Sequence, residues 1–328
     1  MKTAFFSTQS YDKYYFDQVN VNYQNELVYF EASLNAQTAV LAEGCDAVCI
    51  FVNDKADAAT LEKLAEIGIR NIVLRCAGFN QVDLLTAKAL NFKVLRVPAY
   101  SPEAVAEHAV ALILTLNRKT HKAYNRVREG NFSLDRLTGF NLHGKTVGVI
   151  GLGKIGLAFA RIMHGFGCKT IAYDPFELDV PAYIQLVSNE ELFKNSDVIS
   201  IHCPLNESTQ HLINENSLQE MKDGVMLINT SRGAVIHTAA AIEALKTGKL
   251  GYLGIDVYEQ EEKLFFRDLS ESVIPDEQIL RLMSFPNVLI TAHQAFLTLE
   301  ALTEIADTTL KNLQQIEKGQ ASLNSVLK

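Results

Sequence analysis

Short apolar runs and segments of helical spacing alternate along the first part of the chain. The apolar runs are Ala47–Asn53, Asn71–Leu74 and Lys93–Val97. Between them, Ala58–Ile67 and Asp83–Leu90 place apolar residues at helical spacing, and Gly68 suits the C-terminal cap of the first helix. Strand–helix alternation of this kind predicts a parallel β-sheet.

The pattern resumes after a predicted long helix. Ser101 and Pro102 are expected to begin this helix, which reaches about Tyr124, because Ser caps helices and Pro fits their first position. Six apolar strands follow: Thr146–Ile150, Thr170–Tyr173, Val198–His202, Val225–Asn229, Leu253–Asp256 and Val288–Thr291. Their spacing predicts a doubly wound dinucleotide-binding domain. After Thr298 the chain is helical again to about Lys318, and this short tail is expected to pack on the first unit.

Composition narrows the class of protein. Apolar residues make up 48% of the 328 residues and charged residues 21%, which is typical of a globular chain. The net charge of −8 argues against binding to nucleic acid or to an anionic membrane surface. The longest apolar stretch, Ala109–Leu116, is too short to span a bilayer, and no targeting segment is visible. The five cysteines form no CxxC pair, which favours reduced thiols in the cytoplasm over disulfides or a metal site.

A glycine-rich turn follows the first strand of the second unit. Gly151, Gly153 and Gly156 form G-x-G-x-x-G after Thr146–Ile150, with a helix predicted behind them. Such a turn brings the backbone and the helix N-terminus close to a pyrophosphate. The next strand ends in Asp174, where a carboxylate can bind the adenosine ribose and repel a 2′-phosphate. The predicted cofactor is therefore NAD rather than NADP.

Two side chains at other strand ends suit the reduction of a 2-keto acid. Arg232 follows Val225–Asn229, and a guanidinium there can bind a carboxylate with two parallel hydrogen bonds. His293 follows Val288–Thr291 and is the candidate general acid. The remaining histidines have plainer interpretations: His108 and His121 lie on the long helix, His211 looks like a surface loop residue, and His237 is a possible helix cap.

A carboxylate beside His293 would favour its protonated form. Asp256, Glu259 and Glu261 lie in one acidic segment, and spacing alone does not choose among them. For Glu259, a solvated acidic turn is a reasonable alternative.

The chain resembles the D-2-hydroxyacid dehydrogenase family and, within it, the fermentative D-lactate dehydrogenases of bacteria. The resemblance covers nearly the whole length and is narrowest in RCAGF, VPAYSPEAVAEH and HQAFL. The matching segments are Ala47–Asn53, Leu74–Phe79, Val97–His108, Gly148–Gly156, Asn229–Ala234, Asp256–Glu259 and His293–Leu297. It implies NADH-dependent, reversible reduction of pyruvate to D-lactate.

The resemblance also assigns roles. It implies that Arg232 binds the substrate carboxylate, that His293 is the general acid/base, and that Glu261 is its partner. Cofactor contacts are implied at Lys154, Ile155, Cys203, Pro204, Thr209, Thr230, Ser231 and Asp256, beside Gly151, Gly153, Gly156 and Asp174. Relatives often carry Asn or Arg at the position of Thr209. Substrate contacts are implied at Cys76, Ala77, Gly78, Tyr100 and Phe296.

The fold implied is α/β, with two Rossmann-like doubly wound parallel-sheet domains and the NAD domain inserted into the other. A flavodoxin-like substrate domain would cover residues 1–100 and 298–328, and the NAD domain 101–297. Catalysis would depend on closure about the two crossings, and a homodimer through the long helix, or a homotetramer, is expected. A bulkier substrate such as phenylpyruvate or 2-ketoisocaproate is the nearest alternative, and an NAD-sensing corepressor-like protein is a remote one.

Overall fold

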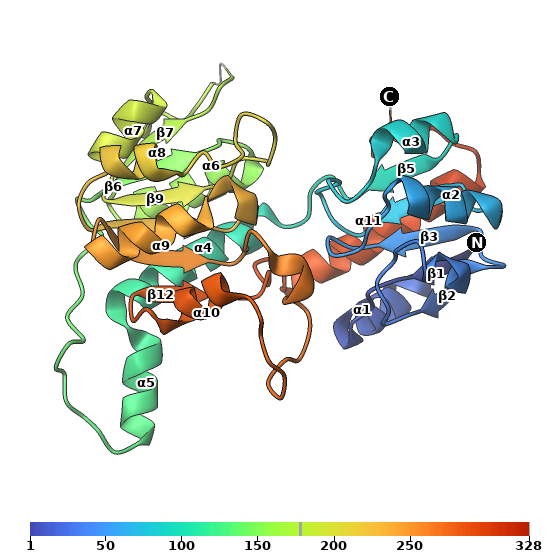
Figure 1. The fold of residues 1–328 in the computed structure, drawn as a ribbon. Coiled ribbons are helices and arrows are strands. Elements are labelled where there is room, and N and C mark those ends of the chain that lie inside the picture. The colour runs from blue at the N-terminus through green and yellow to red at the C-terminus, as the bar shows by residue number, and fades with distance from the viewer. Residues whose placement is uncertain (177–178, 328) are drawn as a thin grey trace. The chain divides into compact units, whose positions relative to one another are not determined.

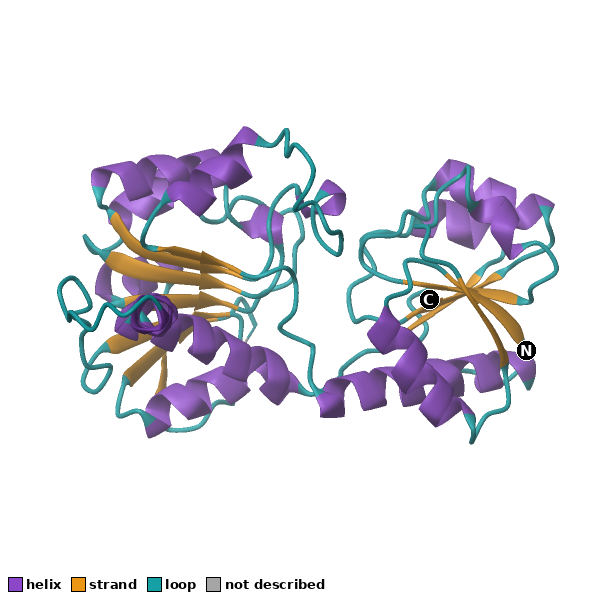
Figure 2. Cartoon of the chain, turned by 90° about the horizontal axis from the view of Figure 1, so that it is seen from below, coloured by secondary structure: helices purple, strands orange, loops and turns teal. Residues whose placement is uncertain are grey.

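A computed structural model describes residues 1–176 and 179–327. The chain forms two compact units, each with helices on both faces of its sheet (Figures 1 and 2). Unit 1 comprises Met1–Ser101 and Phe296–Lys328, and unit 2 comprises Pro102–Ala295. The domain boundaries expected from the sequence were 100/101 and 297/298.

Unit 1 contains a five-stranded parallel sheet with the order β2-β1-β3-β4-β5. This is the strand order of flavodoxin-like folds. Its strands are β1 (Lys2–Phe5), β2 (Glu26–Tyr29), β3 (Ala47–Ile50), β4 (Asn71–Leu74) and β5 (Lys93–Arg96). Its helices are α1 (Ser10–Asn20), α2 (Ala58–Glu66), α3 (Leu84–Ala89) and the C-terminal α11 (Leu299–Glu317), with a 3₁₀ turn at Ala39–Ala42.

The C-terminal tail returns to unit 1, as expected. Thr298 caps α11 by accepting a hydrogen bond from the Ala301 N–H, and the helix packs on α1, β4 and β5. Strands β1 and β2 were not predicted from the sequence. Both strands are only four residues long, and β2 is buried on neither face, so its apolar pattern is weak.

Unit 2 contains a seven-stranded parallel sheet with the order β12-β11-β10-β9-β6-β7-β8. Its strands are β6 (Thr146–Ile150), β7 (Lys169–Tyr173), β8 (Ile184–Leu186), β9 (Val198–Ile201), β10 (Val225–Asn229), β11 (Leu250–Ile255) and β12 (Val288–Ile290). Its helices are α4 (Pro102–Arg118), α5 (Thr120–Arg128), α6 (Lys154–Gly165), α7 (Asn189–Asn195), α8 (Glu215–Glu220), α9 (Thr238–Thr247) and α10 (Glu277–Ser284). Shorter 3₁₀ turns lie at Gly233–Val235 and Glu261–Lys263.

The sheet of unit 2 separates two apolar layers. Helices α4 and α6 cover one face, and α7 to α10 cover the other. The chain runs outward from β6 in both directions, so the strand order reverses beside β6, where doubly wound folds bind their ligands. Six strands were predicted. The seventh, β8, has three residues at the sheet edge and gives little periodic signal.

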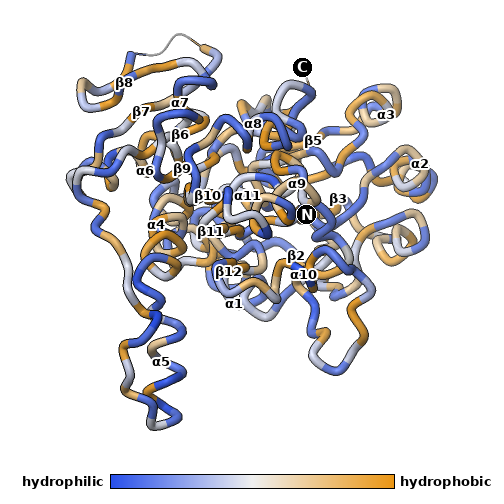
Figure 3. The backbone as a smooth tube through the Cα atoms, turned by 60° about the vertical axis from the view of Figure 1, so that its left-hand side comes forward, coloured by the Kyte–Doolittle hydropathy of each residue, from blue (hydrophilic) through white to orange (hydrophobic). Residues whose placement is uncertain are grey.

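The predicted long helix is interrupted. Pro102 begins α4 as expected, but Lys119 has a φ of 51° and separates α4 from α5. A left-handed residue ends the run of helical hydrogen bonds. In Figure 3, α5 and the segment after it form an arm that extends away from the sheet of unit 2. No helix of the described part of the chain is long and apolar enough to cross a membrane.

Candidate active site

The glycine-rich turn joins β6 to α6 at the point where the strand order reverses. Gly151 has a φ of 92°, and a Cβ there would lie 2.8 Å from the Cys203 nitrogen. A Cβ at Gly156 would overlap the Gly151 carbonyl oxygen. At Gly153, by contrast, a Cβ would meet no atom within 4 Å. Two glycines are therefore required by packing, whereas the third leaves open space in front of the α6 N-terminus.

A cavity of about 600 Å³ opens beside this turn. Its size is ordinary for a ligand pocket. Of the predicted cofactor contacts, six line it: Gly151, Gly153, Asp174, Cys203, Pro204 and Thr209. The lining also includes Asn189, at the start of α7, which was not among the predicted cofactor contacts. It follows β8, the strand that was missed, so its position near the turn could not be deduced.

Asp174 connects β7 to the turn. Its Oδ2 accepts a hydrogen bond from the Leu152 N–H at 2.8 Å, and its Oδ1 accepts one from the Phe176 N–H at 3.1 Å. The carboxylate is half-buried and lines the cavity. An ionised carboxylate has about four acceptor positions, so Asp174 can hold the turn and still accept hydrogen bonds from a ribose.

Other predicted cofactor contacts lie at the carboxyl ends of the strands of unit 2 or on α6. Lys154 and Ile155 form the first turn of α6, while Thr230 and Ser231 follow β10. The Thr230 hydroxyl is buried and has no hydrogen-bond partner among the described residues. An orphaned buried hydroxyl beside a nucleotide turn fits a partner supplied by a bound cofactor. The residues present therefore fit a dinucleotide.

His202 lines the cavity, but its ring is engaged within the protein. It shares a hydrogen bond with the Ser200 hydroxyl at 2.9 Å and packs on Phe159. Burial lowers the pKa of His202 to about 3, so the ring is neutral. This is consistent with a structural role for His202 rather than proton transfer.

His293 and Glu261 form a hydrogen-bonded pair. His293 Nδ1 lies 2.8 Å from Glu261 Oε1, and Glu261 Oε2 accepts a hydrogen bond from the Tyr258 N–H at 2.8 Å. Because a carboxylate can only accept, Nδ1 of His293 carries a hydrogen and Nε2 is left for a ligand. Of the three acidic residues that spacing left open, Glu261 is the one that binds the His293 ring.

Asp256 organises the backbone around His293 instead. Its carboxylate accepts hydrogen bonds from the N–H groups of Gln294 and Ala295, both at 2.9 Å, and its carbonyl accepts one from the His293 N–H at 2.7 Å. Burial raises the pKa of Asp256, but hydrogen bonds from His108 and Thr291 outweigh it and hold the pKa below its usual value. The carboxylate is fully buried.

The contact with His108 corrects the plain interpretation of that residue. His108 was expected to be an ordinary helix residue, yet its Nε2 lies 3.3 Å from Asp256 Oδ1. A signal was present in the sequence. His108 lies four residues from Ala104 and from Leu112, both of which are buried, so helical periodicity places it on the covered face of α4.

Arg232 occupies the turn after β10. Asn229, fully buried, holds this turn by donating to the Arg232 carbonyl at 2.9 Å and accepting from Ser231. Arg232 Nη1 donates to the Ser231 carbonyl at 2.7 Å. A Cβ at Gly233 would overlap the Tyr258–Glu259 peptide, so the Arg232 turn packs directly on the segment that carries Glu261.

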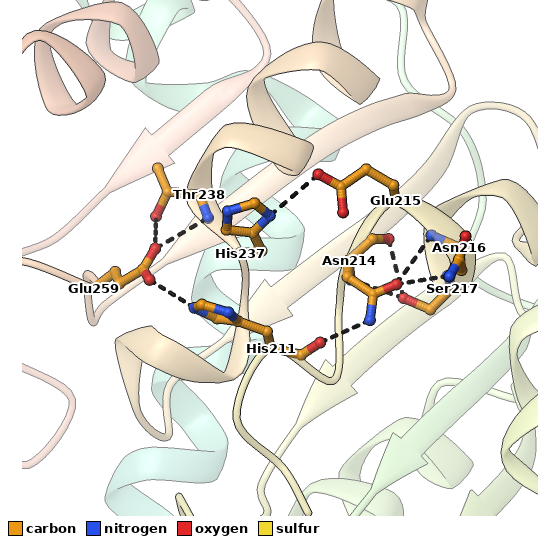
Figure 4. Close-up of polar contacts among 8 residues, drawn as sticks. All are labelled: His211, Asn214, Glu215, Asn216, Ser217, His237, Thr238 and Glu259. Carbon is orange, nitrogen blue, oxygen red and sulfur yellow. Dashed lines mark hydrogen bonds and ion pairs between the residues drawn. The ribbon is translucent and has the colours of Figure 1, made fainter.

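The Glu259 side chain joins its own segment to the loop that carries His211 and to the N-terminus of α9 at Thr238 (Figure 4). Its Oε1 lies 2.6 Å from His211 Nε2, and its Oε2 accepts hydrogen bonds from the Thr238 hydroxyl and N–H. Burial raises the pKa of Glu259, but the bonds from Thr238 and His211 outweigh it and lower the pKa. His211 lies in a loop with its side chain 36% exposed, as expected, but its pairing with Glu259 was not predicted. Glu259 is held by His211 and Thr238, so its interpretation as a solvated acidic turn is wrong. His237 is at the N-cap of α9 as predicted, but its ring contacts Glu215 and does not cap the helix.

Apart from Arg232, which lies in unit 2, the predicted substrate contacts lie in unit 1. Cys76, Ala77 and Gly78 follow β4, and Arg96 donates a hydrogen bond to the Ala77 carbonyl at 2.8 Å. Phe296 is buried against the rings of Tyr100, Phe51 and Tyr11, with centroids 6.4, 5.5 and 6.3 Å away.

Comparisons with known proteins agree with this geometry. A family model described as D-isomer specific 2-hydroxyacid dehydrogenase, NAD binding domain, matches residues 110–295. The D-lactate dehydrogenase of Escherichia coli (strain K12) is 54% identical, with all of both chains aligned. The apo-structure of the D-lactate dehydrogenase from Escherichia coli covers 99% of this chain and 100% of its own at 52% identity, with a TM-score of 0.89. A D-lactate dehydrogenase with NAD⁺ from Lactobacillus jensenii covers all of both chains at 32% identity, with a TM-score of 0.82.

Proposed function

The chain belongs to the D-isomer specific 2-hydroxyacid dehydrogenase family, and we propose that it catalyses the reversible reduction of pyruvate to D-lactate with NADH. The observation that carries the proposal is the His293–Glu261 pair. It lies at the carboxyl ends of the strands of unit 2, as the glycine-rich turn does. It supplies an oriented general acid where a doubly wound fold binds its cofactor. The NAD-binding domain is unit 2.

The proposed roles follow from the chemistry of the side chains. The bound cofactor supplies the hydride that reaches the keto carbon. Arg232 binds the substrate carboxylate, because its planar guanidinium can pair with both oxygens. His293 donates the proton on Nε2 to the carbonyl oxygen, and Glu261 holds the ring by its Nδ1 hydrogen. In the reverse direction, His293 accepts the hydroxyl proton.

The proposed cofactor contacts are the residues that line the cavity and the orphaned Thr230 hydroxyl. Gly151, Gly153 and the α6 N-terminus, with Lys154 and Ile155, would bind the pyrophosphate, and Asp174 would bind the adenosine ribose. Cys76, Ala77, Gly78, Tyr100 and Phe296 are proposed substrate contacts.

Steady-state kinetics test the substrate. We expect the purified protein to oxidise NADH in the presence of pyruvate, and the product to be consumed by an enzyme specific for D-lactate. Phenylpyruvate and 2-ketoisocaproate serve as matched competitors at equal concentration. A kcat/KM larger for either of these would replace pyruvate by a bulkier keto acid, and no turnover of any of them would favour an NAD-sensing protein.

We also propose that the chain forms a homo-oligomer in the cytoplasm. The arm formed by α5 and the segment after it exposes large apolar side chains, with Tyr124 61%, Phe132 74% and Leu134 80% exposed. Apolar side chains grouped in this way are typical of a surface covered by a partner, here a second copy. None of the five cysteines forms a disulfide in the described part of the chain, which is compatible with a reducing compartment. Sedimentation equilibrium would give the oligomeric state.

A further inference from the structure

His108 faces a buried polar network at the strand ends of unit 2. Its Nε2 lies 3.0 Å from Thr291 Oγ1 and 3.3 Å from Asp256 Oδ1. The side chain of His108 is 16% exposed and that of Asp256 is 1% exposed. Helix α4 therefore contributes a histidine to a network whose other members follow β11 and β12.

The hydrogen bonds of Thr291 determine which atom of His108 carries a hydrogen. The Thr291 hydroxyl has one hydrogen, and it donates this hydrogen to Asp256 Oδ1. Toward His108, Thr291 can then only accept, and the Asp256 carboxylate can only accept as well. Nε2 of His108 must therefore be protonated, and it shares its hydrogen between the two oxygens.

The same carboxylate fixes the backbone on the C-terminal side of His293. Asp256 accepts hydrogen bonds from the N–H groups of Gln294 and Ala295. His293 itself has a φ of 52°, in the left-handed region that a non-glycine residue adopts only when its surroundings hold it there. The hydrogen bonds from His108 and Thr291 stabilise the charge of the buried Asp256 carboxylate and fix its position. Without them, both the ionised form and this position would be less favourable.

We propose that His108 is a positioning residue, which holds the Asp256 carboxylate so that the segment from Thr291 to Ala295 presents the His293 ring to the substrate. This inference rests on the proposed role of His293. His108 acts through Asp256 and the backbone, since its own partners are Thr291 and Asp256. The titratable groups around the network are His108 on α4, His293 after β12 and Glu261 after β11.

Two substitutions at one position separate hydrogen bonding from packing. His108→Gln keeps an N–H donor, whereas His108→Leu fills similar space without one. We expect His108→Leu to lower kcat by about 10- to 100-fold, as small displacements of a catalytic group do, while the Kd for NADH stays unchanged. His108→Gln should retain most of the activity. His164→Gln, at an exposed position of α6, is the matched control and should behave as wild type.

The pH profile and a spectroscopic signal provide readouts that a purely structural role would not move. Loss of the His108 hydrogen bond should raise the pKa of Asp256, so the acidic limb of the kcat profile should move to higher pH in His108→Leu. The proton NMR signal of His293 Nδ1–H, bound to Glu261 in the wild type, should broaden through exchange with water in the same variant. This signal is measured without substrate, so it remains informative if the wild type does not reduce pyruvate.

Thr291→Val removes the other donor and keeps the shape, which secures the test if His108→Leu does not fold. We expect the same shift of the acidic limb, and less than additive losses in the double variant, because both side chains act on one carboxylate. An unshifted profile with an intact Nδ1–H signal in either folded variant would overturn the inference. Equal losses in His108→Gln and His108→Leu would also overturn it.

Discussion

Each unit carries a buried aspartate beyond the carboxyl end of a strand that is paired on both sides, and the two residues have different partners. Asp54 follows β3 in unit 1 and is 3% exposed, while Asp256 follows β11 in unit 2 and is 0% exposed. Both carboxylates accept backbone N–H groups of neighbouring turns. In both units, a buried carboxylate therefore holds neighbouring turns in place through their backbone N–H groups.

The ionisation of the two groups differs. Burial raises the pKa of Asp54, and the nearby Arg75 and three hydrogen bonds only partly offset it. Burial acts in the same direction on Asp256, but His108 and Thr291 reverse the result. The segment held by Asp256 carries His293, whereas the donors to Asp54 are the Ser7 hydroxyl and the N–H groups of Leu34 and Phe51. The comparison indicates a structural carboxylate in unit 1 and one that supports chemistry in unit 2.

The largest effect should come from the residue that Asp256 positions. His293→Gln removes the proposed general acid, and we expect kcat to fall by at least ~10²-fold. The thermal unfolding midpoint and the Kd for NADH should stay at their wild-type values. Stopped-flow and steady-state measurements on the same preparation check this, and wild-type turnover in the variant would remove the chemical role assigned to this strand end.

Arg232→Lys tests the second group at the same edge. A lysine ammonium cannot form the paired contact with a carboxylate, so kcat/KM for pyruvate should fall by about 10²-fold. Arg70→Lys in unit 1 is the matched control, because the Arg70 guanidinium donates only to carbonyl oxygens of its own turn among the described contacts. If both variants lost activity equally, the loss could not be attributed to substrate binding.

Much of this arrangement follows from the chain itself, and the reasons are local. The glycine-rich turn, Asp174 and the strand-end positions of Arg232 and His293 depend on short-range patterns, which a sequence displays directly. The choice of Glu261 over Glu259 does not, because it depends on how the 3₁₀ turn at Glu261–Lys263 directs each side chain. The resemblance supplied that choice, and the hydrogen bond to His293 agrees with it.

The missed features share a different cause. The strands β1, β2 and β8 lack a run of buried apolar residues, because β1 begins with Lys2 and Thr3, β2 is buried at no position, and β8 is buried only at Ile184. His108 and His211 bind partners that are far away in the sequence, Asp256 and Glu259. Tertiary contacts of this kind become visible only when the sheet brings α4, β11 and the loop before α8 together.

The unit 1 aspartate should affect stability and not chemistry. Asp54→Asn offers one acceptor oxygen where three donors converge, so one buried donor loses its partner, at a cost of about 1–3 kcal/mol in the free energy of unfolding. We expect kcat to be unchanged. Urea unfolding followed by circular dichroism measures the difference, and a loss of kcat in folded protein would contradict the comparison.

The pH dependence of that difference has a definite sign. Because the pKa of Asp54 is raised in the folded state, its contribution to stability is complete below its ordinary pKa of about 4 and is lost as the pH rises through the folded value. The stability gap between wild type and Asp54→Asn should therefore be smaller at neutral pH than in mild acid. A gap that widens toward neutral pH would mean that burial does not dominate at this site.

The smallest effect concerns the choice of cofactor in unit 2. Asp174→Ala should narrow the preference for NADH over NADPH by about tenfold, because the carboxylate no longer repels a 2′-phosphate. Asp174 also accepts the Leu152 and Phe176 N–H groups, so loss of loop support could imitate a loss of charge. Asp174→Asn separates the two, since it keeps an acceptor oxygen but not the charge. If repulsion governs the preference, both variants should narrow the ratio of kcat/KM for the two cofactors. If loop support governs it, Asp174→Asn should retain the wild-type ratio, and the assignment of NAD selectivity to this charge would be wrong.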